Sequence, residues 1–137
     1  MTNIFIDSAA FKAVFDVKDD FHYCAWDYWN KIATTSYKLI TTNYILDESL
    51  TLFRAYLGKQ YALNLYKNIF DHNDKILLEH ISRADEAEAW SYFEKLPGRG
   101  VSFTDCTSFA VMKRLSLKQA FTFDKDFEKA GFDVVPL

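Results

Sequence analysis

The order of secondary-structure patterns is the feature that most constrains this chain. Short runs of β-forming residues alternate with longer stretches of helical periodicity, and this order builds βαβ units around a mainly parallel sheet. Strands are expected at residues 3–7, 38–41, 75–81 and 119–123, with an edge strand at 133–136. The pattern therefore predicts an α/β fold.

Helices are expected between these strands. Four are expected over about 8–16, 20–35, 59–71 and 125–130. Three more, over about 43–57, 82–96 and 104–115, begin at a residue that can cap a helix, namely Asn43, Ser82 and Thr104. The 137 residues suffice for one domain with a buried core, and the strong interior turn signal is a Pro-Gly loop at 97–100. We expect a single domain over residues 1–137.

Composition and charge exclude several classes of protein. Half of the residues are hydrophobic and 18% are aromatic, which predicts an ordered globular chain. A net charge of −3 argues against binding of nucleic acid through a broad basic surface, but is compatible with a nuclease whose carboxylates bind cations. The apolar run at 4–6 is too short for a signal peptide, and no stretch is long and apolar enough to span a membrane. We therefore expect a cytoplasmic protein.

The cysteines and histidines show no metal-ligand spacing. Cys24 and Cys106 are far apart and have no CxxC partner, which favours reduced thiols over a disulfide or a zinc site. His22, His72 and His80 are expected at the surface or at the edge of the core.

Two aspartates directly follow apolar strands. Asp7 ends the run at 4–6, and Asp124 follows the run at 120–123; in open α/β sheets, sites form at such carboxyl ends. Each has a structural alternative, because Asp7 could cap the next helix and Asp124 could be a turn residue. Thr122 could orient Asp124 through a side-chain hydrogen bond.

Two further acids are expected on helices at positions that face apolar residues. On a helical wheel Glu48 falls between Leu52 and Ala55, and Asp105 shares the arc of Phe109. The helix of Glu48 is expected to be covered on most sides, with a buried stripe at Leu46, Leu50, Phe53 and Leu57. The alternatives are a structural salt bridge for Glu48 and a favourable charge at a helix N-terminus for Asp105.

Other acids are expected on solvated surfaces. The helix over 82–96 has apolar positions at Ala87, Trp90 and Phe93. Its acids are therefore assigned to the solvated face: Asp85, Glu86, Glu88 and Glu94.

Strand ends and the helix starts that follow strands lie along one edge of a parallel sheet, so Asp7, Glu48, Asp105 and Asp124 can converge. Clustered carboxylates have raised pKa values and oppose folding unless cations bind. An all-oxygen site suits Mg²⁺ or Mn²⁺ rather than zinc. Such ions lower the pKa of a bound water, orient it for attack at phosphorus and stabilise the leaving oxygen. The pattern predicts phosphodiester hydrolysis that needs no nucleophilic side chain.

The sequence resembles the PIN-domain nucleases, particularly the bacterial VapC-type toxins, over nearly its whole length. The matching segments, in that family's order, are NIFIDSAAF, TTNYILDESL, VSFTDCTSFAVM and AFTFDKDFEKAGF. The resemblance implies that the catalytic and metal-binding acids are Asp7, Glu48, Asp105 and Asp124, supported by the polar residues Ser8 and Thr122. Asp126 stands where the family often varies and is left as a possible fifth ligand.

The same resemblance implies a three-layer α/β/α domain that cleaves single-stranded RNA with Mg²⁺ or Mn²⁺. It also implies a toxin that is often a homodimer and is neutralised by a small antitoxin protein. Arg99 and Lys12 are the expected partners of RNA phosphates. An aromatic helix is assigned to the core and to a dimer or antitoxin surface rather than to base stacking; its residues are Tyr23, Trp26, Tyr28 and Trp29.

Two other classes remain as alternatives. A non-catalytic module that binds protein or RNA would have little reason to keep four inward acids. A phosphatase of another α/β family needs a second acid two residues after its nucleophilic aspartate, and Asp7 has Ala9 at that position. Nucleotide-binding folds are disfavoured because neither GxGxxG nor GxxxxGK[ST] occurs.

Overall fold

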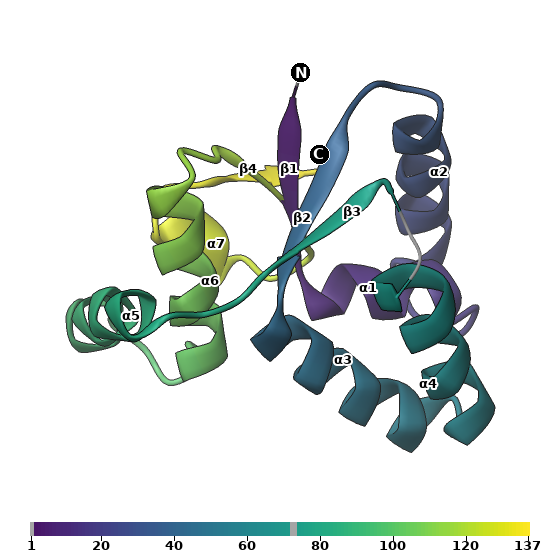
Figure 1. Cartoon of the computed structure of the whole chain (residues 1–137), viewed down its shortest axis with the longest axis horizontal. Coiled ribbons are helices and arrows are strands. Elements are labelled where there is room, and N and C mark those ends of the chain that lie inside the picture. The colour runs from purple at the N-terminus through teal and green to yellow at the C-terminus, as the bar shows by residue number, and fades with distance from the viewer. Residues whose placement is uncertain (1, 72–73) are drawn as a thin grey trace.

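The sheet has five parallel strands in the order β3-β2-β1-β4-β5 (Figure 1). The computed structural model describes residues 2–71 and 74–137. The strands are β1 (Asn3–Ile6), β2 (Lys38–Thr42), β3 (Ile76–Glu79), β4 (Gln119–Phe121) and β5 (Asp133–Val135). The predicted α/β class and parallel sheet are confirmed, and β5 is an edge strand as expected.

Helices cover both faces of the sheet. They are α1 (Ser8–Phe15), α2 (His22–Ala33), α3 (Asn43–Tyr56), α4 (Lys59–Leu65), the π-helix η1 (Tyr66–Asp71), α5 (Arg83–Lys95), α6 (Phe103–Arg114) and α7 (Asp126–Lys129). Helices α1 to α4 lie on one side and α5 to α7 on the other (Figure 1). The molecule therefore has the expected three layers, and the helix predicted over 59–71 continues from α4 into η1.

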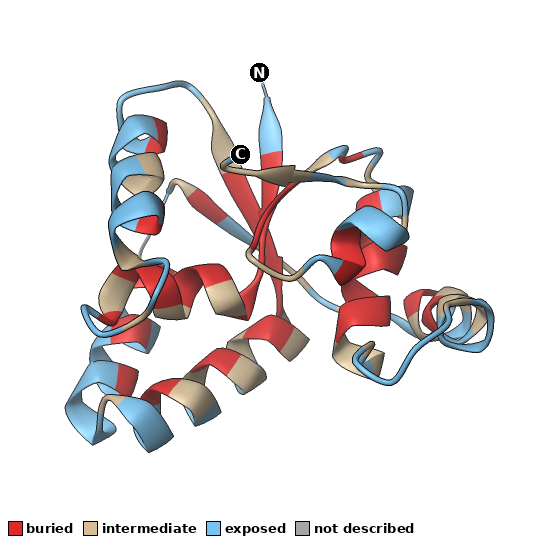
Figure 2. Cartoon of the chain, turned by 180° about the vertical axis from the view of Figure 1, so that it is seen from behind, coloured by how far each residue is buried: buried red, intermediate tan, exposed pale blue. Residues whose placement is uncertain are grey.

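Strand β1 occupies the centre of the core. Ile4, Phe5 and Ile6 are fully buried, because β2 and β4 pair with β1 and the helical layers cover it (Figure 2). The Phe5 ring lies 6.2 Å from that of Phe127, which meets Phe109 of α6 edge-on at 4.9 Å. This continuous run of apolar residues leaves polar groups only at the strand ends.

The strand order reverses at β1. The chain runs outward from β1 to β2 and β3, and then returns to form β4 on the other side of β1. In open parallel sheets, such a reversal leaves a crevice outside the carboxyl ends of the strands. The residues that follow β1 and β4 therefore lie where a site is expected.

Two of the predicted helix caps are displaced. Thr42 caps α3, since its Oγ1 accepts the N–H of Ile45 at 3.1 Å, while the side chain of Asn43 accepts the N–H of Ile81 instead. Ser102 rather than Thr104 caps α6. The predicted Ser82 cap of α5 is confirmed. In both displaced cases the capping residue is one whose hydroxyl oxygen accepts the N–H of the residue three positions later.

The predicted orientation of α5 was wrong. Asp85 is buried, and both of its oxygens accept hydrogen bonds from Arg114 of α6, at 2.9 and 3.1 Å. Ala89 is buried on the same side, whereas Trp90 and Phe93 are exposed. From helical periodicity, Asp85 is expected to face solvent. Its burial is favourable because Arg114 on the neighbouring helix donates hydrogen bonds to it.

Helix α3 is less covered than predicted. Of the four residues expected in its buried stripe, only Phe53 is buried, and Leu46, Leu50 and Leu57 are partly buried. The reason is that α3 lies at the outer edge of its layer (Figure 1). Within the described ranges, no helix is long and apolar enough to cross a membrane.

Candidate metal centre

Asp7 and Thr122 meet where the strand order reverses. Ile6 pairs with Phe121 across β1 and β4, which places the next residue of each strand side by side. The Thr122 hydroxyl donates to Oδ2 of Asp7 at 2.8 Å, and both residues are buried. Asp7 occupies the N-cap position of α1, yet its side chain makes no capping hydrogen bond. The Asp7 carboxylate therefore lies at the crevice outside the strand ends and does not cap helix α1.

Glu48 joins the start of α1 to α3. Its Oε1 accepts a hydrogen bond from the Ser8 hydroxyl, and the glutamate is partly buried. Among the described residues, no lysine, arginine or histidine forms an ion pair with Glu48. The structural salt bridge considered as an alternative is therefore not found.

Asp105 lies in the first turn of α6, where it takes part in the helix cap and is also buried. Its Oδ2 accepts the N–H of Ser102 at 3.1 Å, and its own N–H donates to Oγ of Ser102 at 2.9 Å, which completes a capping box. Asp105 is nevertheless buried, at 7% exposure. The helix-terminus interpretation and the inward orientation are both correct for this residue.

Asp124 and Asp126 form a tight group with Asp105. One carboxylate oxygen from each of the three lies within 4.8 Å of the others, an arrangement that could hold a metal ion. Oδ1 of Asp124 accepts the N–H of Asp126 at 2.9 Å, and the N–H of Asp124 donates to Oγ1 of Thr122 at 3.1 Å. Asp124 is therefore a turn residue and a member of the cluster; the Thr122 side chain bonds it as predicted, through the backbone N–H rather than the carboxylate. Lys129 contacts Asp126 at 3.3 Å.

The acids of this region raise one another's pKa values. Burial, followed by the charges of Asp105 and Glu48, raises the pKa of Asp7 to about 7 despite its bond from Thr122. Burial, followed by the charges of Asp124 and Glu48, raises the pKa of Asp105 to about 6 despite the Ser102 cap. Burial raises the pKa of Asp124 as well. The charges of Glu48, Asp105 and Asp124 thus act on Asp7 or on one another, while only Asp105 and Asp124 of the four predicted acids belong to the tight group with Asp126.

The donor set fits a hard divalent cation. Oδ1 of Asp7 is buried and has no hydrogen-bond partner among the described residues, so this oxygen is left to accept a cation. The surrounding candidates are carboxylates, the ligands that Mg²⁺ and Mn²⁺ prefer. Asp105, Asp124 and Asp126 could therefore hold such an ion. Asp7 and Glu48 lie outside this tight group, and the charge of Glu48 acts on both Asp7 and Asp105.

The cysteines and the described histidines are not part of the candidate metal centre. Burial, together with the charges of Asp105 and Asp126, raises the pKa of the Cys106 thiol to about 11, so this thiol is protonated and unreactive. Cys24 is exposed and unpaired. His22 is partly buried with its Nδ1 against the carbonyl of Ala13, and His80 is exposed, while His72 lies outside the described residues.

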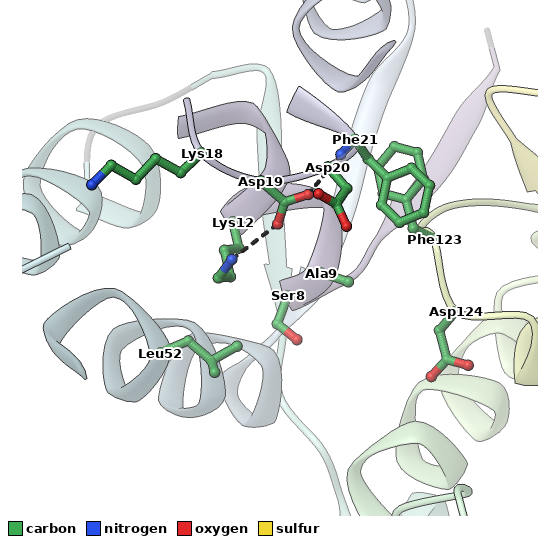
Figure 3. Close-up of a pocket in the computed structure, with 10 residues that line it drawn as sticks. All are labelled: Ser8, Ala9, Lys12, Lys18, Asp19, Asp20, Phe21, Leu52, Phe123 and Asp124. Atoms are coloured by element: carbon green, nitrogen blue, oxygen red, sulfur yellow. Dashed lines mark hydrogen bonds and ion pairs between the residues drawn. The ribbon is translucent and has the colours of Figure 1, made fainter. Parts of the chain in front are cut away.

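A groove of about 480 Å³ runs from the acids along α1. Ser8 and Asp124 line it from different elements, and Lys12, Asp19 and Phe21 also line it (Figure 3). The groove is open to solvent.

The two expected phosphate partners differ in their surroundings. Lys12 binds Asp19 at 2.9 Å and Asp16 at 3.1 Å, so its charge is already balanced. Burial alone would lower the pKa of Lys12, but these carboxylates outweigh it and raise that pKa. Arg99 is exposed and forms no ion pair within the described part of the chain. A carbon added to the next residue, Gly100, would lie 3.5 Å from Oδ2 of Asp126, so the loop of Arg99 runs beside the acids.

The family profile described as PIN domain matches residues 4–133. The chain belongs to the PIN domain family. This PIN domain is 31% identical over 129 residues to the 23S rRNA-specific endonuclease VapC20 of Mycobacterium tuberculosis, in strains CDC 1551 / Oshkosh and ATCC 25618 / H37Rv. The alignment covers 94% of this chain and 95% of each relative.

Solved structures agree with the PIN domain assignment. The crystal structure of M. tuberculosis VapC20, titled a Sarcin-Ricin loop cleaving toxin, matches with a TM-score of 0.84 and 30% identity over 94% of this chain and 95% of that one. VapBC2 from Rickettsia felis, in a structure bound to a DNA fragment from its promoter, matches with a TM-score of 0.72 and 8% identity over 97% of both chains. FitAcB from Neisseria gonorrhoeae matches with a TM-score of 0.65 and 15% identity over 97% of this chain and 96% of that one. At these low identities, the last two show the fold alone.

Proposed function

We propose that this PIN domain is an endoribonuclease that hydrolyses phosphodiester bonds of single-stranded RNA with Mg²⁺ or Mn²⁺. The observation that carries the proposal is the group of buried and partly buried carboxylates at the point where the strand order reverses, whose charges help to raise the pKa values of Asp7 and Asp105. A fold has no structural need for such a group, because unneutralised buried charge opposes folding. A bound cation removes that cost.

In this proposal the catalytic and metal-binding residues are Asp7, Glu48, Asp105 and Asp124, with Asp126 as a fifth ligand. A cation held by them would supply a water of lowered pKa and would stabilise the leaving oxygen. Thr122 keeps Asp7 oriented by donating to its Oδ2, and Ser8 does the same for Glu48. Because the pKa of Asp7 is raised to about 7, a cation held beside it near neutral pH would favour the ionised carboxylate.

The similarity to VapC20 supports RNA as the substrate class and a toxin as the biological role. That relative is named an rRNA-specific endonuclease, and its structure is titled a toxin. We propose by extension a single nuclease domain over residues 1–137 that acts in the cytoplasm, forms a homodimer and is neutralised by a small antitoxin. Arg99, whose loop runs beside the acids and which forms no ion pair with the described residues, is the proposed contact for an RNA phosphate.

The test is cleavage of an end-labelled single-stranded RNA pool, and of 23S rRNA, by purified protein freed of any bound partner. We expect cutting with Mn²⁺ and none with EDTA. Asp105→Asn should cut at least about 100-fold more slowly; its side-chain oxygen can still accept the Ser102 N–H, so α6 keeps its cap. Equal cutting by Asp105→Asn would reject the proposed role of the acids. No cutting of any RNA would favour the non-catalytic binding module instead.

A further inference from the structure

Two phenylalanine rings stack at the rim of the groove. The centroids of Phe21 and Phe123 are 4.6 Å apart, and the ring planes differ by only 6°. Both rings line the groove that also holds Ser8 and Asp124 (Figure 3). Because Phe123 directly precedes Asp124, the stacked pair is tied through the backbone to a carboxylate of the metal centre.

The Phe21 ring is available to a ligand. Phe123 covers one face of it, yet Phe21 remains 50% exposed. Its backbone is held in place, since its N–H donates to Oδ1 of Asp19 at 2.9 Å and Oδ2 of Asp19 binds Lys12 at 2.9 Å. A platform that is already ordered loses little entropy when a flat ligand stacks on it.

The charges near Phe21 favour an uncharged group. The groove is lined by two lysines, Lys12 and Lys18, and by three aspartates, Asp19, Asp20 and Asp124, so it has no excess of positive charge. Lys12 is neutralised by its ion pairs. A phosphate gains little in such surroundings, whereas a nucleobase carries no charge and presents a flat π-face.

We propose that the Phe21–Phe123 pair receives an unpaired nucleobase of the RNA, beside the phosphodiester that is cut. This inference rests on the proposed function and adds how the substrate is selected. A base inside a duplex stays in its own stack, so the platform selects single-stranded segments with little preference for sequence. The aromatic side chains of α2 do not offer this platform: Tyr28 packs on Phe121 and Trp29 on Phe11. Tyr23 and Trp26 are exposed but do not line the groove.

The first experiment compares steady-state cleavage by Phe21→Leu, Phe21→Trp and the wild type, with Mn²⁺ and an oligonucleotide cut from the pool. Leucine keeps apolar volume but has no π-face, so we expect its kcat/KM to fall about tenfold, mainly through KM. Tryptophan should keep or lower KM. Phe93→Leu is the control, because Phe93 is similarly exposed (43%) on α5 and does not line the groove.

The second experiment needs no cleavage. Single-stranded RNA that carries 2-aminopurine is titrated with each protein in EDTA at low salt, and stacking is read as quenching of the 2-aminopurine fluorescence. The wild type, Phe21→Trp and Phe93→Leu should quench it, and Phe21→Leu should quench it clearly less, with a melting temperature close to that of the wild type.

The outcomes separate the two proposals. If the wild type cuts RNA but Phe21→Leu has an unchanged KM and equal quenching, the stacking site is rejected and the nuclease stands. If Phe21→Trp is as impaired as Phe21→Leu, the ring only anchors its loop, which also overturns the site. If the wild type quenches 2-aminopurine without cutting any RNA, the stacking site stands and the nuclease fails. If the wild type neither cuts RNA nor quenches the 2-aminopurine fluorescence, both the nuclease and the stacking site are rejected.

Discussion

Asp7 carries the largest electrostatic cost among the acids of the site. It is 3% exposed, its Oδ1 has no hydrogen-bond partner among the described residues, and Thr122 compensates only Oδ2. Burial therefore outweighs the hydrogen bond, and the pKa rises from 3.8 to about 7. A residue in this state weakens the fold at neutral pH until a cation neutralises it.

The raised pKa of Asp7 predicts a pH-dependent stability in EDTA. Between pH 4 and 7 the folded chain binds the Asp7 proton more tightly than the unfolded chain, so the free energy of unfolding falls as pH rises through this window. We expect Asp7→Asn to melt at least about 3 °C above the wild type at pH 8, and by less at pH 5, in thermal unfolding followed by circular dichroism.

The control for that comparison is Asp47→Asn, on the exposed face of α3, which should not change the melting temperature. A lower melting temperature for Asp7→Asn at pH 8 would mean that the carboxylate stabilises the fold.

At the level of single residues, the sequence predicts those acids that follow apolar strands. Asp7 and Asp124 are recognisable because a strand end fixes where the next side chain lies. Asp126 is a possible fifth ligand on the family resemblance, and its place beside Asp105 depends on the turn in which its N–H donates to Asp124, which periodicity does not indicate. The stacking of Phe21 on Phe123 joins residues 102 positions apart, and neither periodicity nor composition indicates it.

At the level of elements, the pairing of α5 with α6 depends on a buried charge. Asp85 caps the start of α5 through Ser82 and also receives two hydrogen bonds from Arg114. Burial alone would raise the pKa of Asp85, but Arg114 and the Ser82 N–H outweigh it and lower that pKa. The sequence could not show this, because an acid in the first turn of a helix is equally well explained by the helix dipole.

Removing the partner of Asp85 should destabilise the α5–α6 pair. Asp85 with its lowered pKa contributes stability above about pH 4, and this contribution is lost as the pH falls through the folded-state pKa. Arg114→Leu should therefore lower the free energy of unfolding by about 1 kcal/mol at pH 7, a value kept small because Arg114 is 42% exposed, and by less below pH 4. Urea titrations at both pH values measure this difference.

The neighbouring Lys113→Leu provides the matched control, since Lys113 pairs with Glu88 at the exposed surface. An equal loss of stability in both variants would show that the loss comes from surface charge in general.

At the level of the whole molecule, the sheet order explains why the acids meet. The strand pattern predicted β1 to β5 closely, because buried strands and amphipathic helices leave clear periodicities. The coverage of each helix was less predictable: α3 is only partly buried along its apolar stripe, and α5 exposes Trp90 and Phe93. Periodicity identifies the apolar side of a helix, but it does not show which neighbouring element lies there.

The most direct test of the account measures Mn²⁺ binding by the purified protein. Bound Mn²⁺ is quantified from the loss of the electron paramagnetic resonance signal of free Mn²⁺. We predict saturable binding of at least one ion per chain, weakened at least about tenfold in Asp105→Asn and unchanged in Asp47→Asn. Equal binding by the wild type and Asp105→Asn, or no binding by the wild type, would contradict the claim that these carboxylates form a divalent-metal centre.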